Sequence, residues 1–148
     1  MLYTLYTAYS LLMVIALSAV LAVWKGGWAE RVGAGVNLLA ALSFELAQRQ
    51  LAGDALATTT LVLDGVLALS FLGLTLRFAK TWLGLAMLLQ AMQFALHAYY
   101  YVVERKLDAL FAIVNNLVSW GLIACIVGGV AGHWASEHRR RRAVLHPL

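Results

Sequence analysis

Polar side chains that can bind protons or cations recur at helical spacing within apolar stretches of this sequence. Gln90, Gln93 and His97 are three and four residues apart, so they share one face of a helix. Asn37, Ala41, Glu45 and Gln48 form a similar stripe earlier in the chain. We call the following set the polar cluster: Glu45, Gln48, Asp64, Gln90, Gln93, His97, Asn115 and Asn116. Ionisable groups within a membrane are typical of proton and cation pathways.

Five apolar runs must position these side chains, at residues 2–24, 32–51, 55–78, 81–103 and 107–134. A hydrocarbon layer about 30 Å thick takes roughly 20 residues of helix to cross, and each run is close to that length. The composition agrees, because 63% of the residues are hydrophobic and 12% are charged, against about 25% charged in a soluble domain. The sequence therefore predicts an all-α integral membrane protein, with a five-transmembrane-helix bundle in residues 1–134.

Lysine and arginine are divided unequally between the two predicted membrane surfaces. Basic residues of short loops stay on the cytoplasmic side. With the N-terminus outside, that side holds Lys25, Arg31, Arg77, Lys80 and Arg139 to Arg142, and the opposite side holds only Arg49, Arg105 and Lys106. We therefore expect an outside N-terminus and a cytoplasmic C-terminus. The preference for arginine over lysine, with abundant alanine and glycine, is compatible with a location in the cell inner membrane of a bacterium.

The predicted cytoplasmic tail, residues 135–148, contains four consecutive arginines, Arg139, Arg140, Arg141 and Arg142. Each basic residue near a negatively charged leaflet contributes about 1 kcal/mol of binding. We expect the tail to bind anionic lipid, with an acidic patch on a partner protein as the alternative. The tail also accounts for the net charge of +4, so no nucleic-acid partner is predicted.

The last apolar run carries a stripe of small residues, Gly121, Cys125, Gly128 and Gly132. Small side chains let helix backbones approach closely, so the stripe predicts helix packing, either within the chain or against another subunit. Trp120 lies near the middle of the same run. Because its indole N–H needs a partner, we expect this side chain to face a neighbouring helix or a polar group rather than lipid.

Three interpretations of the polar cluster stay open. The polar groups can satisfy one another and set the register of the helices. They can form a proton or cation path, with Asp64 near mid-membrane and His97 as the titrating relay. A metal held by Glu45, Asp64 and His97 is chemically reasonable, whereas one haem cannot bind His97 and His133, which lie at opposite ends of their runs. We predict no metal and no cofactor.

The sequence contains no Gly-rich phosphate loop and no HExxH, GxSxG or CxxC motif, so we do not expect an enzyme. The short loops, the acid in the third run and the Gln, Gln and His of the fourth resemble the layout of small polytopic inner-membrane proteins of bacteria. That resemblance implies no activity.

The expected function follows from the small-residue faces and the short connections of the predicted bundle. We expect a non-catalytic membrane subunit or accessory and assembly factor that contacts the lipid bilayer and binds other membrane subunits or itself. The alternative is a proton or cation conduit, as a small transporter, a channel or a holin-like oligomeric pore.

Overall fold

The computed structural model describes residues 2–104, 106 and 108–145, and the side chains of 10–104, 106 and 108–142. This part of the chain is all helical. The five helices are α1 (Leu2–Lys25), α2 (Trp28–Gln50), α3 (Gly53–Phe78), α4 (Thr81–Val102) and α5 (Ala109–Leu145). The prediction of an all-α chain with five helices is therefore confirmed.

Local sequence signals explain where the helices begin and end. α2 starts after Gly26 and Gly27, and the Gly27 amide donates to the Glu30 side chain at 3.1 Å, which satisfies one free N–H of the first turn. α3 ends at Phe78, and the next residue, Ala79, has a left-handed φ of 49° that stops the helix. Asp108 accepts a bond of 3.0 Å from the Phe111 amide and so caps α5. Because the connections are short, successive helices run antiparallel.

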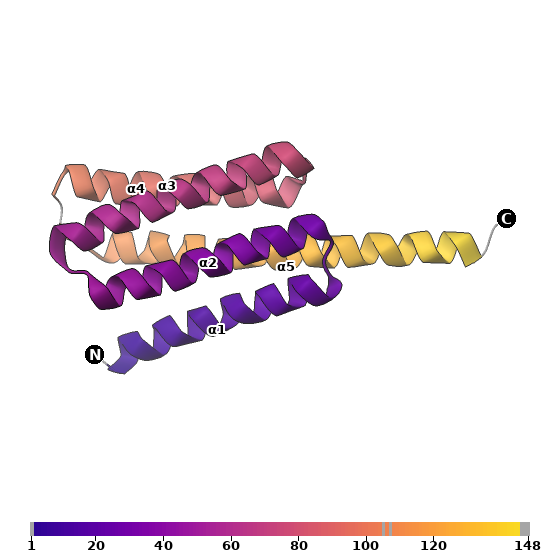
Figure 1. The fold of residues 1–148 in the computed structure, drawn as a ribbon, viewed down its shortest axis with the longest axis horizontal. Helices are drawn as coiled ribbons and strands as arrows, with labels where there is room; N and C mark the ends of the chain where they lie inside the picture. The colour runs from indigo at the N-terminus through magenta and orange to yellow at the C-terminus, as the bar shows by residue number, and fades with distance from the viewer. Residues whose placement is uncertain (1, 105, 107, 146–148) are drawn as a thin grey trace.

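The helices form a closed ring, in which each packs against the next along the chain and α5 returns to α1. We call one end of the bundle the N-terminal end. It holds the start of α1 and the α2–α3 and α4–α5 connections (Figure 1). The C-terminal end holds the α1–α2 and α3–α4 connections, and from it α5 projects alone (Figure 1). The predicted boundary after residue 134 falls within this continuous helix.

The apolar core fills the half of the bundle toward the C-terminal end. One cluster includes Phe71, Leu83 and Leu122, and a second joins small residues of α1 and α2 to Ile126 of α5. Close packing here depends on large side chains meeting small ones.

The indole of Trp82 is wedged between two glycines of this core. A Cβ at Gly33 or at Gly129 would lie only 2.7 Å from Trp82 ring atoms. In this position between the two glycines, Trp82 Nε1 donates to Glu30 Oε1 at 3.2 Å. Glycine is therefore required at both positions for the indole to cross between α2 and α5.

The predicted small-residue stripe of α5 divides between the inside and the outside of the bundle. Gly121 packs against Leu89, and Cys125 packs against the first core cluster. Gly128 and Gly132 are exposed, and a Cβ at either would have no atom within 4 Å. Only the first half of the stripe therefore packs within the chain.

The prediction that Trp120 faces a neighbouring helix is wrong, because its side chain is 53% exposed. Trp120 lies next to Gly121 on α5 but about 100° around the helix from it. The packing that turns Gly121 toward Leu89 of α4 therefore turns Trp120 outward.

Two of the helices in the described part of the chain are long and apolar enough to cross a membrane, Gly53–Phe78 and Ala109–Arg142. Only 17% and 22% of their most apolar windows are buried in the bundle, so they do not resemble the buried core helix of a soluble protein. Five spans are not confirmed. In α2 and α4, the polar residues of the predicted stripes lower the hydropathy.

Candidate functional site

Asp64 of α3 is the centre of the polar contacts in the bundle and is 1% exposed. Gln90 Nε2 donates to Asp64 Oδ1 at 3.1 Å, and His97 Nδ1 bonds to Asp64 Oδ2. Gln90 and His97 lie two turns apart on α4, so the α4 stripe engages both oxygens of the carboxylate. The helical spacing of the stripe thus positions an Asp–His pair inside the bundle.

Gln93 extends this network from α4 to α5. Its Nε2 donates to Asn115 Oδ1. Its Oε1 is buried and, among the described residues, has no hydrogen-bond partner. A buried polar atom without a partner costs about 1–3 kcal/mol, so Gln93 Oε1 is an acceptor available to a donor or a cation.

These side chains line a cavity of about 1330 Å³ to which all five helices contribute. Its polar wall includes Asp64, Gln90, Gln93, His97 and Asn115. The cavity reaches exposed residues at the N-terminal end of the bundle, namely Asp54 and Glu104. Toward the C-terminal end it stops at Leu67, Val118 and Leu122, which belong to or border the apolar core. The cavity therefore occupies only half of the bundle.

Negative charge predominates in the wall of this cavity. The described residues that line it include four carboxylates, Glu45, Asp54, Asp64 and Glu104, together with His97, and no lysine or arginine. Arg49 lies beside the wall and forms an ion pair with Glu45 at 2.8 Å. The excess of acceptors and negative charge favours a positively charged occupant.

The eight predicted members of the polar cluster separate into three groups. The structure brings five into direct contact in pairs: Asp64, Gln90, Gln93, His97 and Asn115. Glu45 and Gln48 line the same cavity, but Glu45 pairs with Arg49 on its own helix. Asn116 is exposed and is absent from the cavity wall, so its assignment to the cluster is corrected. It lies about 100° around α5 from Asn115.

Tyr100 was not among the predicted site residues, although it lies one turn after His97 on the same stripe. Its hydroxyl donates to Asp108 Oδ1 at 2.6 Å. Its ring packs edge-on to Phe111, and the His97 ring lies 5.0 Å from the same Phe111 ring. These contacts hold the imidazole of His97 against α5, and the i, i+3 spacing from His97 could have identified Tyr100.

Glu30 is a second buried acid that sequence reasoning missed. It is 1% exposed, accepts bonds from the Gly27 amide and Trp82 Nε1, and lies 3.9 Å from Lys80 Nζ. It lies at the C-terminal end of the bundle, across the apolar core from Asp64. Its position three residues after Gly27, at the start of a helix, is a capping signal that the sequence does contain.

The predicted tail residues Arg139 to Arg142 lie on the projecting part of α5. Arg141 Nη2 donates to Glu137 Oε1 at 2.6 Å, and Arg139 Nε donates to the Ala135 carbonyl at 3.4 Å. The hydrogen bond and the charge of Arg141 lower the pKa of Glu137. The described side chains contain no group of three His, Cys, Asp or Glu residues placed to hold a metal ion.

Comparisons with protein-family models, with curated proteins and with solved structures find no match. The function therefore has to be inferred from the cavity and its residues.

Proposed function

We propose that this chain is an integral membrane protein that admits a proton or a small cation from the N-terminal end of the bundle and binds it at Asp64. The observation that carries the proposal is the buried Asp64–His97 pair in the wall of a cavity that no lysine or arginine of the described chain lines.

The outer surface of the bundle supports a membrane location. Large apolar side chains are exposed on every helix, for example Leu17, Leu39, Leu69, Leu88 and Ile113. An apolar surface of this extent is typical of proteins that contact lipid or a partner. The C-terminal end gathers most of the basic residues of the turns and of α5, so we infer that this end faces the cytoplasm.

The Asp64–His97 pair has the chemistry needed to exchange a proton for a cation. A carboxylate and an imidazolium together are electrically neutral, and so are a carboxylic acid and a neutral imidazole. If a monovalent cation replaces the shared proton, the site stays neutral again. Exchange between neutral states avoids the cost of a net charge within hydrocarbon, about 2.5–3.5 kcal/mol on insertion scales. The unpartnered Gln93 Oε1 is a further ligand for the cation.

The apolar half of the bundle favours a carrier over an open pore. Phe71, Leu83 and Ala86 are fully buried in the core cluster beyond the cavity. An ion cannot pass this packed region without a rearrangement of the helices. A cavity that ends halfway through the bundle is consistent with a carrier that opens to one side of the membrane at a time.

The test is flux into liposomes that contain the purified chain. We expect an imposed pH gradient to collapse when Na⁺ or K⁺ is added outside, and Asp64→Asn to slow this by at least about tenfold. The amide oxygen of the introduced asparagine could still accept the Gln90 hydrogen bond, so the substitution removes charge and leaves the shape. The matched control is Glu30→Gln, which changes an equally buried acid outside the cavity.

Three results would count against the carrier proposal. If wild type and Asp64→Asn show the same flux, Asp64 has no part in transport. If Glu30→Gln abolishes flux as well, the effect of Asp64→Asn reflects general damage to the bundle. An absence of flux in all variants would favour a purely structural polar cluster.

A membrane subunit is the second candidate function, and the outer face of α5 favours it. Ile113, Leu117 and Trp120 are exposed along this face, which continues to the open glycines Gly128 and Gly132. We expect Gly128→Ile to remove a partner that co-purifies from native membranes with the wild type. Gly73→Ile is the matched control, because Gly73 of α3 also has open space around it. Equal recovery of the partner with both variants would exclude this face of α5.

A further inference from the structure

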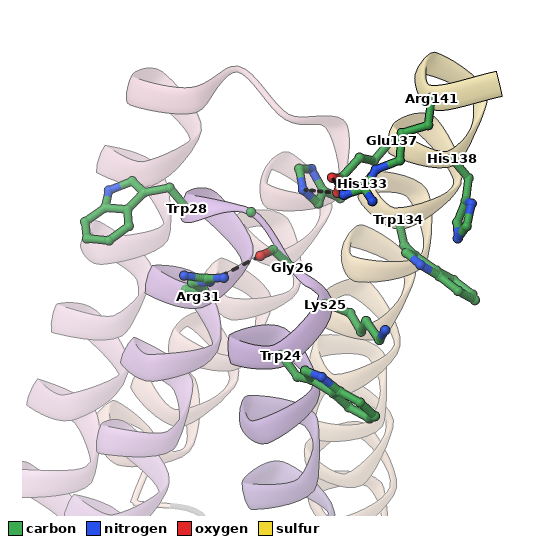
Figure 2. Close-up of a pocket in the computed structure, with 11 residues that line it drawn as sticks. Trp24, Lys25, Gly26, Trp28, Arg31, His133, Trp134, Glu137, His138 and Arg141 are labelled. Atoms are coloured by element: carbon green, nitrogen blue, oxygen red, sulfur yellow. Dashed lines mark hydrogen bonds and ion pairs between the residues drawn. The ribbon is translucent and has the colours of Figure 1, made fainter. Parts of the chain in front are cut away.

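A second cavity, of about 570 Å³, lies at the C-terminal end of the bundle between the α1–α2 connection and α5. Figure 2 shows Trp24 and Lys25 at the end of α1 beside Trp134 and His138 of α5. The ionisable side chains that line it are Lys25, Arg31, His133, Glu137, His138 and Arg141. It is distant from Asp64, and the apolar core lies between the two cavities.

The charge of this second cavity is positive. Lys25, Arg31 and Arg141 are permanent cations, and Glu137 is the one acid among the lining residues that the structure describes. Glu137 is already paired with Arg141 at 2.6 Å, so two cations remain uncompensated. His133 lies 4.0 Å from Glu137, and both histidines of the wall add positive charge when protonated. The occupant is therefore expected to be an anion.

A hydrogen bond and a close contact fix two basic residues in the wall of this cavity. Arg31 Nε donates to the Gly26 carbonyl at 3.2 Å, which fixes the guanidinium beside the turn (Figure 2). A Cβ at Gly27 would lie 2.8 Å from His133 Cε1, so the turn and α5 are in close contact. Arg31 and His133 are thus positioned before any ligand arrives.

The aromatic residues indicate that the anion carries an apolar part. Lys25 Nζ lies 4.6 Å from the centroid of the Trp24 ring and 5.8 Å from that of Trp134. Trp24 is largely exposed and Trp134 about half exposed, and the exposed apolar surface of α1 continues from Trp24 to Val20 and Val23. Tryptophan and lysine in this arrangement are typical of the boundary between headgroups and acyl chains.

We infer that this cavity binds the phosphate headgroup of an anionic phospholipid, whose acyl chains lie along the exposed apolar surface of α1. The inference rests on the membrane location in the proposed function but not on ion transport. The inference assigns this role to one arginine of the tail. Arg141 lines the cavity, whereas Arg139, Arg140 and Arg142 do not. Basic pockets at the cytoplasmic side of membrane helices are known to bind such headgroups.

The test measures how tightly the full chain, in an uncharged detergent, binds a fluorescent short-chain phosphatidylglycerol. One basic residue near an anionic surface corresponds to about a fivefold change in affinity. We expect Lys25→Gln and Arg31→Gln each to weaken binding about fivefold and Arg140→Gln to weaken it less than about twofold. We expect Glu137→Gln to strengthen binding about fivefold, a gain that misfolding could not produce.

Control measurements separate a headgroup site from a general attraction between opposite charges. Glu104→Gln changes the net charge as Glu137→Gln does but lies at the opposite end of the bundle, so it should leave affinity unchanged. Equal binding of phosphatidylcholine, or competition by inorganic phosphate at the same concentration as the lipid, would overturn the inference. Equal effects of Arg31→Gln and Arg140→Gln on the affinity for the lipid would also overturn the inference. Failure of the membrane location is a separate result, because the purified chain would then stay monodisperse without detergent.

Discussion

Replacing Asp64 with leucine tests whether the buried polar network stabilises the bundle. The carboxylate accepts a bond of 3.1 Å from Gln90 and is bonded to His97. Leucine has a similar size but no acceptor, so the change leaves two polar groups of α4 without partners. Asp64 is 1% exposed, so both bonds are made inside the bundle rather than at its surface.

The magnitude follows from these two bonds. Hydrogen bonds between membrane helices contribute about 0.6 kcal/mol on average and about 1.7 kcal/mol at most, so the loss of two predicts a destabilisation of about 1–3 kcal/mol. Glu45→Leu is the matched comparison within the same cavity. Glu45 is partly exposed, and the contact that the described residues show for it is with Arg49 at i+4, a contact worth about 0.3–0.5 kcal/mol. The two variants should therefore differ clearly.

The assay is the free energy of unfolding of the detergent-solubilised chain, measured by titration with a denaturing detergent and followed by helix content. Asp64→Asn is measured in the same way. Because asparagine keeps an acceptor for Gln90, this variant should lose less unfolding free energy than Asp64→Leu. Equal stability of Asp64→Leu and Glu45→Leu would refute the reasoning, since the Asp64 contacts would then contribute nothing measurable to the fold.

Two other predictions concern packing and pH. Gly129→Ala should destabilise the bundle by about 1–3 kcal/mol through overpacking against Trp82 and shift the Trp82 fluorescence, whereas Gly128→Ala, with open space around it, should be neutral or slightly stabilising. Equal unfolding free energies for the two variants would contradict the close packing of Trp82 against Gly129. The pKa of Glu137 is lowered, chiefly by Arg141, so its pairing stabilises the projecting part of α5 above the ordinary pKa of 4.5 and is lost as pH falls through the lowered value. Protection of the amides of residues 133–142 against hydrogen exchange, corrected for the intrinsic pH dependence of exchange, should therefore fall below about pH 4.5, and Arg141→Gln should remove that fall.

Local patterns in the sequence were sufficient to predict the helices. The apolar runs predicted α3 and α4 to within two residues at each end, and helical spacing identified Gln90, Gln93 and His97 as one stripe. Helix formation and the sharing of a face depend on residues three or four apart. Both could therefore be predicted without knowing how the helices pack. The predicted end of the last run at residue 134 missed the continuation of α5 to Leu145, because the polar composition of that part hides its helical structure.

The tertiary structure decided which faces meet. It paired His97 with Asp64 rather than with Glu45, turned Asn115 inward and Asn116 outward, and used Gly129 instead of Gly128 to receive Trp82. One residue corresponds to a rotation of about 100° around a helix axis. A small difference in the rotation of a helix therefore decides between a buried partner and an exposed side chain. That rotation is set by side chains far apart in the sequence, such as Leu89 against Gly121, which periodicity along a single helix does not specify.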